Sequence, residues 1–239
     1  MQSEDRGGFQ FVLLKTISRA GDLAIFVEIT AGGSVTTLTD RALGILHEWV
    51  QSENLRRHCY AVADSMGHFA QLQGTDADSW QAVGLLHDMD YERHPNQEQN
   101  ASEGHPFTAV RWLRENGWNE EICRAILSHA SYSGVTRETP LERTLYAVDE
   151  LSGFVMAVAL VRPSKSIHDV DVPAVKKKMK DKAFARAVNR EDIVRGAAEL
   201  GMPLDNVIAG VIAALQADAE RLSLAGNVGR VADLPIDNK

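Results

Sequence analysis

Cysteine, aromatic residues, positive charge and long apolar runs are all scarce in this sequence of 239 residues. Its two cysteines, Cys59 and Cys123, lie in apolar helical patterns without paired spacing, so we expect neither a disulfide framework nor a cysteine zinc site. The longest nearly apolar run, residues 151–161, is too short to cross a bilayer. The first residues do not have the layout of a secretory signal. We therefore expect a cytoplasmic protein without a membrane partner.

Acidic residues outnumber basic ones, with 33 Asp and Glu against 25 Lys and Arg, for a formal net charge of −8. This balance argues against a nucleic-acid polymer or an anionic membrane as partner, because both bind basic surfaces. The one lysine-rich stretch, residues 176–182, is predicted to be a solvated helix face. With 44% hydrophobic residues, the chain has the composition of a globular protein with a sizeable core.

The hydrophobic pattern changes near residue 37. Within a short N-terminal extension, residues 1–36, two β-favouring runs at 9–14 and 24–29 predict a β-hairpin, with a poorly ordered extension as the alternative. From residue 37 to 224, apolar residues recur at three- and four-residue spacing, which predicts one all-α domain with additional C-terminal helices, followed by a loose tail at 225–239. The predicted helices span residues 38–50, 55–72, 78–89, 103–115, 120–129, 141–161, 172–188, 190–200 and 204–222.

Ionisable side chains interrupt the apolar faces of several predicted helices, although burying such groups is costly unless something compensates for their charge. Six are predicted to point inward from five helices: His58, His87, Asp88, His105, His129 and Asp149. Each alone is expected to be a hydrogen-bonded core residue, but six without a shared partner would leave several unsatisfied, at roughly 1–3 kcal/mol each. Imidazole and carboxylate ligands favour iron, manganese, zinc, cobalt or nickel over calcium. The sequence therefore predicts a site for a divalent transition-metal ion.

Three stretches carry four of these residues in order: "NLRRHCYAVA", "GLLHDMDYE" and "LYAVDELSG". They resemble the HD superfamily of metal-dependent phosphohydrolases, and the similarity, to a subgroup without an assigned substrate, covers about residues 38–222. The resemblance implies an HD-domain helical bundle in which one ion is held by His58, His87, Asp88 and Asp149. Its bimetallic branch further implies a second ion held by His105 and His129, with Asp88 bridging the pair.

The resemblance implies hydrolysis of a phosphoester or phosphoanhydride by a metal-activated water, with a nucleotide or a related small phosphorylated metabolite as substrate. Two ions about 3.5–4 Å apart would activate that water near neutral pH. Asp88 is expected to place the nucleophile, and Asp90 and His47 are the candidates for general acid or base. The candidate phosphate ligands, for which a solvated charged surface is the alternative, are Arg162, Lys165, Arg186 and Asn189.

Two other functions fit the same predicted ligands. One is an HD-type diiron oxygenase, which would need dioxygen, whereas hydrolysis would not. The other is a non-catalytic metal- and nucleotide-binding module. Apolar surface on the last predicted helix, residues 204–222, serves either to close the domain or to pair two subunits as a homodimer.

Overall fold

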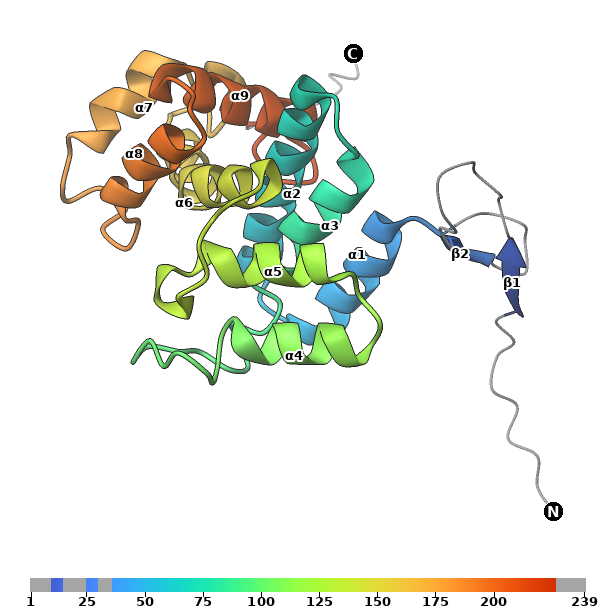
Figure 1. The fold of residues 1–239 in the computed structure, drawn as a ribbon. Coiled ribbons are helices and arrows are strands. Elements are labelled where there is room, and N and C mark those ends of the chain that lie inside the picture. Colours follow the sequence, from blue (N-terminus) through green and yellow to red (C-terminus); the bar gives the residue numbers. More distant parts are fainter. Residues whose placement is uncertain (1–9, 15–24, 30–35, 227–239) are drawn as a thin grey trace, which may run out of the picture.

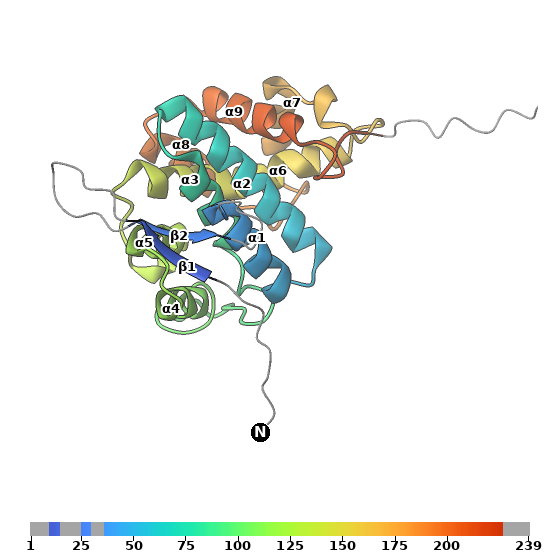
Figure 2. The ribbon, with the colours of Figure 1, turned by 90° about the vertical axis from the view of Figure 1, so that its right-hand side faces the viewer.

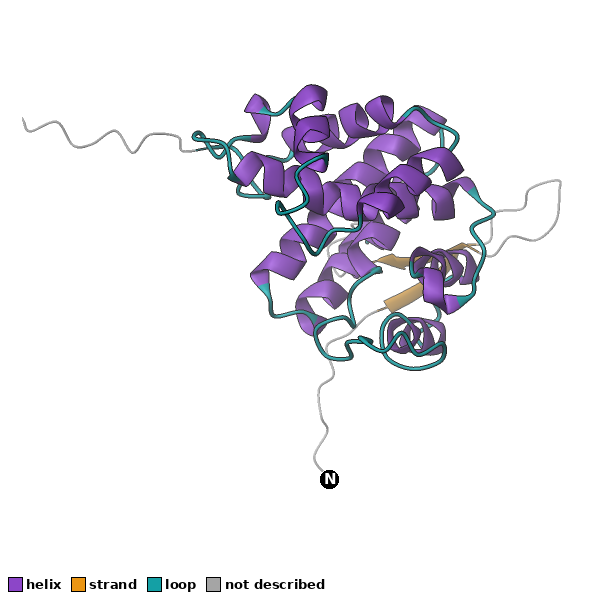
Figure 3. Ribbon diagram, turned by 90° about the vertical axis from the view of Figure 1, so that its left-hand side faces the viewer, coloured by secondary structure: helices purple, strands orange, loops and turns teal. Residues whose placement is uncertain are grey.

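Residues 10–14, 25–29 and 36–226 are described by the computed structural model, and most of them lie in helices, which confirms the all-α fold class (Figures 1 and 3). Two short 3₁₀ turns lie at Ser131–Ser133 and Ile167–Asp169. The helices are α1 (Leu38–Trp49), α2 (Glu53–Gln73), α3 (Ala77–Leu86), α4 (Phe107–Glu115), α5 (Glu120–His129), α6 (Pro140–Leu160), α7 (Val172–Met179), α8 (Arg190–Glu199) and α9 (Leu204–Ala217).

Short-range side-chain hydrogen bonds define where the main helices begin and end. Thr37 and Asp40 form a capping box that starts α1, and Thr139 and Glu142 form another that starts α6. Helix α2 ends at Gly74, whose φ of 67° is the left-handed conformation that glycine adopts without a steric penalty. Local sequence therefore determines where α1 and α6 begin and where α2 ends.

Several predicted helices are too long, and these boundaries are wrong. The helix predicted at 103–115 begins at Phe107, because Pro106 has no N–H and stands before the first turn. The helix predicted at 172–188 ends at Met179, since the Asp181 side chain accepts the N–H groups of Ala183 and Phe184 in a turn that competes with the helix. The helices predicted at 78–89 and 204–222 end at residues 86 and 217.

The N-terminal extension contains two short strands, β1 (Gln10–Leu14) and β2 (Ile25–Ile29), drawn in orange in Figure 3. They pair antiparallel, with Val12 opposite Val27, as the hairpin alternative predicts. Residues 15–24, between the strands, lie outside the described residues. So does most of the predicted loose tail, from residue 227 onward.

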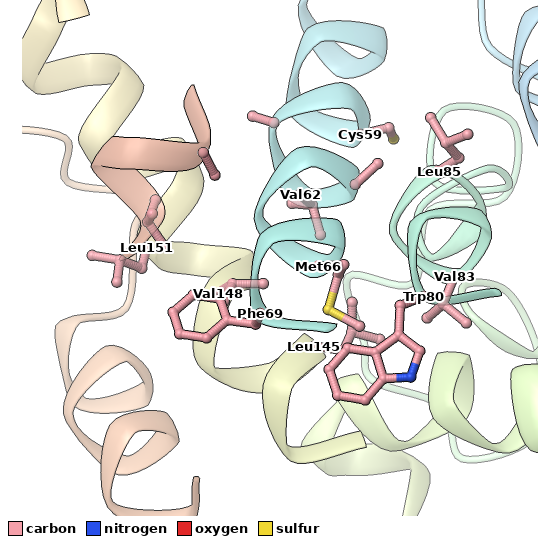
Figure 4. Close-up of a cluster of buried hydrophobic side chains, with 14 of the residues drawn as sticks. Cys59, Val62, Met66, Phe69, Trp80, Val83, Leu85, Leu145, Val148 and Leu151 are labelled. Atoms are coloured by element: carbon pink, nitrogen blue, oxygen red, sulfur yellow. The ribbon is translucent and has the colours of Figure 1, made fainter. Parts of the chain in front are cut away.

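The core lies where α2, α3 and α6 pack together, and the C-terminal α9 lies beside α2 and α6 (Figures 1 and 2). Figure 4 shows Cys59, Val62 and Met66 along α2, among side chains of α3 and α6. No single helix in the described part of the chain is long and apolar enough to cross a membrane; α8 and α9 meet that test only together, as a pair bent by 102°.

Helices α2 and α3 approach each other closely at Gly84. A Cβ atom at this position would lie 2.5 Å from the Cα atom of Ala63 and 2.7 Å from its backbone nitrogen. Only glycine therefore allows this separation between the two helices. Because His58 lies on α2 and His87 follows the last residue of α3, the same contact also determines how close these two histidines lie.

We predict that Gly84→Ala lowers the free energy of unfolding by about 1–3 kcal/mol, because the added methyl group meets rigid backbone. Gly44→Ala is the matched control: Gly44 is also helical, and a Cβ there meets nothing within 4 Å. The control should gain about 0.5–1 kcal/mol from its higher helix propensity. Urea unfolding measures both variants, and equal stability of the two would contradict the close approach of α2 and α3.

Candidate metal centre

The structure brings the six predicted ligands together, and all of them except the fully buried His87 line a cavity of about 640 Å³. They form two groups of three, and within each group the candidate ligand atoms lie within 4.8 Å of one another. The first group is His58, His87 and Asp149. The second is Asp88, His105 and His129.

The first group joins α2, the end of α3 and α6. The Nε2 atom of His58 lies 3.0 Å from Oδ1 of Asp149 and 3.3 Å from Nε2 of His87. His87 Nε2 is in turn 3.4 Å from the same Asp149 oxygen. His87 is fully buried, whereas the His58 and Asp149 side chains are partly exposed to the cavity. These three atoms therefore surround one point.

Asp88 faces both groups with different oxygens. Its Oδ1 lies 3.4 Å from Nε2 of His105 and 3.7 Å from Nε2 of His129, and these two nitrogens are 3.2 Å apart. Its Oδ2 lies 3.4 Å from Nε2 of His87 and 3.6 Å from Nε2 of His58. One carboxylate thus offers an oxygen to each group, which is the arrangement that a bridging ligand requires.

The prediction that these side chains come from five helices is wrong in detail. His58, His129 and Asp149 lie within helices, but His87 is the residue that caps α3, and Asp88 lies in the turn after it. His105 lies in the loop before α4. The loop and turn residues were expected to be helical because their apolar neighbours continue the helical spacing beyond the true helix ends.

Backbone carbonyls determine which ring nitrogens face the centre. Nδ1 of His87 lies 2.8 Å from the Gly84 carbonyl oxygen, and Nδ1 of His129 lies 2.5 Å from that of Ile126. A carbonyl only accepts, so each Nδ1 donates its proton, and the Nε2 lone pair of the neutral ring points at the group. Nε2 of His129 lies 3.2 Å from Nε2 of His105, so a cation between these two nitrogens would stabilise both rings.

Buried charge in the centre shifts the pKa of several groups. Burial lowers the pKa of His129 to about 4, and His105 beside it acts in the same direction. Burial also lowers the pKa of His87, but Asp88 and Asp149 outweigh it, so that this pKa lies well above its usual value. The pKa of Asp88 lies below its usual value because His87 outweighs the effect of burial. Asp88 and Asp149 therefore favour a positive charge beside them.

The donor set fits a transition metal. With ligand bonds of about 2.1 Å, donor atoms around one ion lie about 3.0–3.4 Å apart. Within the two groups, the distances between candidate donor atoms run from 3.0 Å for His58 and Asp149 to 3.7 Å for His129 and Asp88. Imidazole and carboxylate donors suit iron, manganese, zinc, cobalt or nickel. The six side chains can therefore hold one or two such ions.

The geometry does not support a role for Asp90 as general acid or base. Asp90 is fully buried; its Oδ1 lies 2.8 Å from Nδ1 of His105, and its Oδ2 accepts the Ala109 N–H at 2.7 Å. Both oxygens are thus engaged behind His105, outside the cavity lining. Asp90 orients His105 and the first turn of α4 instead. The other candidate, His47, is exposed and contacts the hydroxyl of Tyr60, also outside the cavity lining.

Of the four predicted phosphate ligands, Asn189 lines the cavity, and the prediction for the other three, Arg162, Lys165 and Arg186, is not supported. Arg162 follows the end of α6, 13 residues beyond Asp149, which corresponds to roughly 20 Å along a helix axis. Even Asn189 uses its Oδ1 to accept the first backbone N–H groups of α8. None of the four predicted residues therefore offers the cavity a positive charge for binding phosphate.

The sequence analysis missed one basic residue and three tyrosines of the cavity wall. They are Arg195, Tyr91, Tyr132 and Tyr146. Arg195 lies on the polar surface of α8 and reaches the cavity only because α8 packs against α6. No spacing within the sequence indicates that contact.

The helical fold and the cluster of histidine and aspartate side chains beside a polar cavity are typical of helical proteins that bind metal ions. The family model for the HD domain matches residues 55–153 of this chain. HD domains are characteristic of metal-dependent phosphohydrolases, and the matched residues include all six candidate ligands: His58, His87, Asp88, His105, His129 and Asp149.

Among curated proteins, the chain is similar to Ribonuclease Y of Rhodopirellula baltica. The two are 30% identical over 146 residues, which is 59% of this chain and 25% of that protein. The chain thus spans about a quarter of the length of this relative. No solved structure matches the chain.

We predict that Asp88→Ala weakens the binding of both metal ions and abolishes turnover, because a single carboxylate faces both groups. Metal content after reconstitution with Mn²⁺ and dialysis measures the loss. His168→Ala is the control, since His168 is exposed and lies outside both groups. Retention of both ions in Asp88→Ala would contradict the bridging role.

We predict that His129→Ala removes one ion and leaves the other tightly bound, because His129 belongs to the second group only. The same measurement should then give about half the wild-type metal content per chain. Equal weakening of both ions would show that the division into two groups is wrong.

Proposed function

We propose that this protein is a metal-dependent phosphohydrolase that cleaves a phosphoester or phosphoanhydride bond in a small, nucleotide-like substrate. Asp88 carries the proposal, because its two oxygens face two separate groups of metal-competent side chains. The HD domain supports the reaction class. The substrate class is our inference from the cavity and from the charge of the chain.

When bound, a pair of divalent ions would neutralise the negative charge of the phosphoryl oxygens and lower the pKa of a bound water molecule to near neutrality. The protein contributes a centre that is oriented in advance. Asp90 fixes the His105 ring, and the Ile126 carbonyl fixes the His129 ring, so neither imidazole has to reorient during the reaction. The exposed edges of Asp88 and Asp149 meet the cavity, and the phosphoryl group is therefore expected at the bottom of the cavity, above them.

A small substrate is favoured over a nucleic-acid polymer or a membrane lipid. The relative Ribonuclease Y is a ribonuclease by name, but this chain spans only a quarter of it. The net charge of −8 disfavours a polyanionic partner, since such partners bind through clusters of basic residues. A cavity of about 640 Å³ lies within the range of small-molecule sites.

Phosphate release from a panel of nucleotides and p-nitrophenyl phosphate, with Mn²⁺, Co²⁺ or Fe²⁺ added to metal-free protein, tests the proposal. We expect release that depends on the metal, that disappears in Asp88→Ala and that continues without dioxygen. Activity that stops under anaerobic conditions would instead support a diiron oxygenase. Bound metal without turnover of any member of the panel would support a non-catalytic binding module.

A further inference from the structure

Positive charge is scarce in the cavity above the candidate metal centre. Apart from the candidate ligands, the charged residues that line it are Glu150, Asp192 and Arg195. Arg195 is the single lysine or arginine among the described residues of the lining. A substrate with several phosphoryl groups therefore has at most one guanidinium to meet beyond the metal centre.

Arg195 is already paired within the cavity wall through two of its three guanidinium nitrogens. Its Nε donates to the hydroxyl oxygen of Tyr146 at 2.6 Å, and its guanidinium also contacts the Asp192 carboxylate. The Tyr146 hydroxyl donates to the same Asp192 oxygen at 2.7 Å, which closes a network of three side chains. Asp192 thus neutralises the one basic side chain of the wall. The other acidic residue of the wall, Glu150, offers no positive charge to a phosphoryl group either.

The remaining wall is uncharged but rich in rings and amides. Tyr91 and Tyr132 lie near the centre: the Tyr91 ring packs edge-on against His105, with centroids 5.2 Å apart, and the Tyr132 hydroxyl donates to the His105 carbonyl. Tyrosine faces stack on flat rings, and amide groups both donate and accept hydrogen bonds at the edges of nucleobases. The amides of the lining are Asn96, Gln97, Gln99 and Asn189.

Building on the proposed function, we propose that the cavity takes a nucleoside monophosphate and that Asp192 is the residue that excludes substrates with a second phosphoryl group. The single phosphoryl group meets the metal centre, and the uncharged nucleoside lies among the tyrosines and amides. Hydrolysis forms one P–O bond from water and breaks the P–O bond to the nucleoside oxygen. That oxygen takes up a proton, and the products are a nucleoside and inorganic phosphate.

The test compares binding of adenosine 5′-monophosphate and adenosine 5′-diphosphate to protein reconstituted with Mn²⁺, by equilibrium dialysis with chromatography of the recovered nucleotides. Asp192→Asn keeps an oxygen for Tyr146 and Arg195 but removes the charge. Glu191→Gln is the matched control, since Glu191 is the preceding acid of α8, is exposed and lies outside the cavity lining.

We expect the wild-type protein and Glu191→Gln to bind the monophosphate about tenfold more tightly than the diphosphate. In Asp192→Asn the unpaired guanidinium should tighten diphosphate binding by about tenfold and leave monophosphate binding nearly unchanged. Arg195→Gln, at a side chain that is 50% exposed, is a second variant that should fold without difficulty. It leaves the Asp192 charge unpaired and should widen the preference for the monophosphate.

Tighter or equal binding of the diphosphate by wild-type protein would overturn the inference, as would binding of neither nucleotide or an unchanged preference in both cavity variants. Phosphate release, followed separately, distinguishes this failure from failure of the proposed function. Selective monophosphate binding without release contradicts hydrolysis alone. Release from both nucleotides without selective binding contradicts the role of Asp192 alone.

Discussion

The need for positive charge between buried imidazoles and carboxylates is the constraint on which the rest of this structure depends. Nε2 of His105 and Nε2 of His129 lie 3.2 Å apart, and both approach the Asp88 carboxylate. In an apolar interior such an arrangement is stable only with a cation, because unpaired buried charge is far costlier than a lost hydrogen bond. Divalent ions bound between these side chains would supply that charge to all of these atoms.

The surrounding fold holds these groups in place from several directions. Gly84 lets α3 approach α2 and also provides the carbonyl that orients His87. Asp90 orients His105 and, through the Ala109 N–H, connects it to the first turn of α4. Gly84 thus serves both the close helix contact and the orientation of a candidate ligand, so packing and ligand geometry depend on each other.

The candidate ligands could be predicted from the sequence because each is an ionisable side chain that interrupts an apolar face or follows one directly. The same reasoning placed Asp90 in catalysis, since spacing alone does not reveal that both its oxygens are engaged behind His105. Arg195 escaped prediction for a different reason. Its position at the cavity depends on the packing of α8 against α6, a contact between residues about 50 apart in the chain, for which one sequence holds no signal. Helix ends were predicted least well. Turns such as the one at Asp181 end a helix although the apolar spacing continues beyond it.

Anomalous diffraction at the manganese absorption edge, from crystals of protein reconstituted with Mn²⁺, tests the central claim most directly. The account predicts two anomalous peaks, one beside His58, His87 and Asp149 and the other beside His105 and His129, with one Asp88 oxygen toward each. Crystals with no peak among these six side chains, or with manganese bound only elsewhere on the chain, would contradict it.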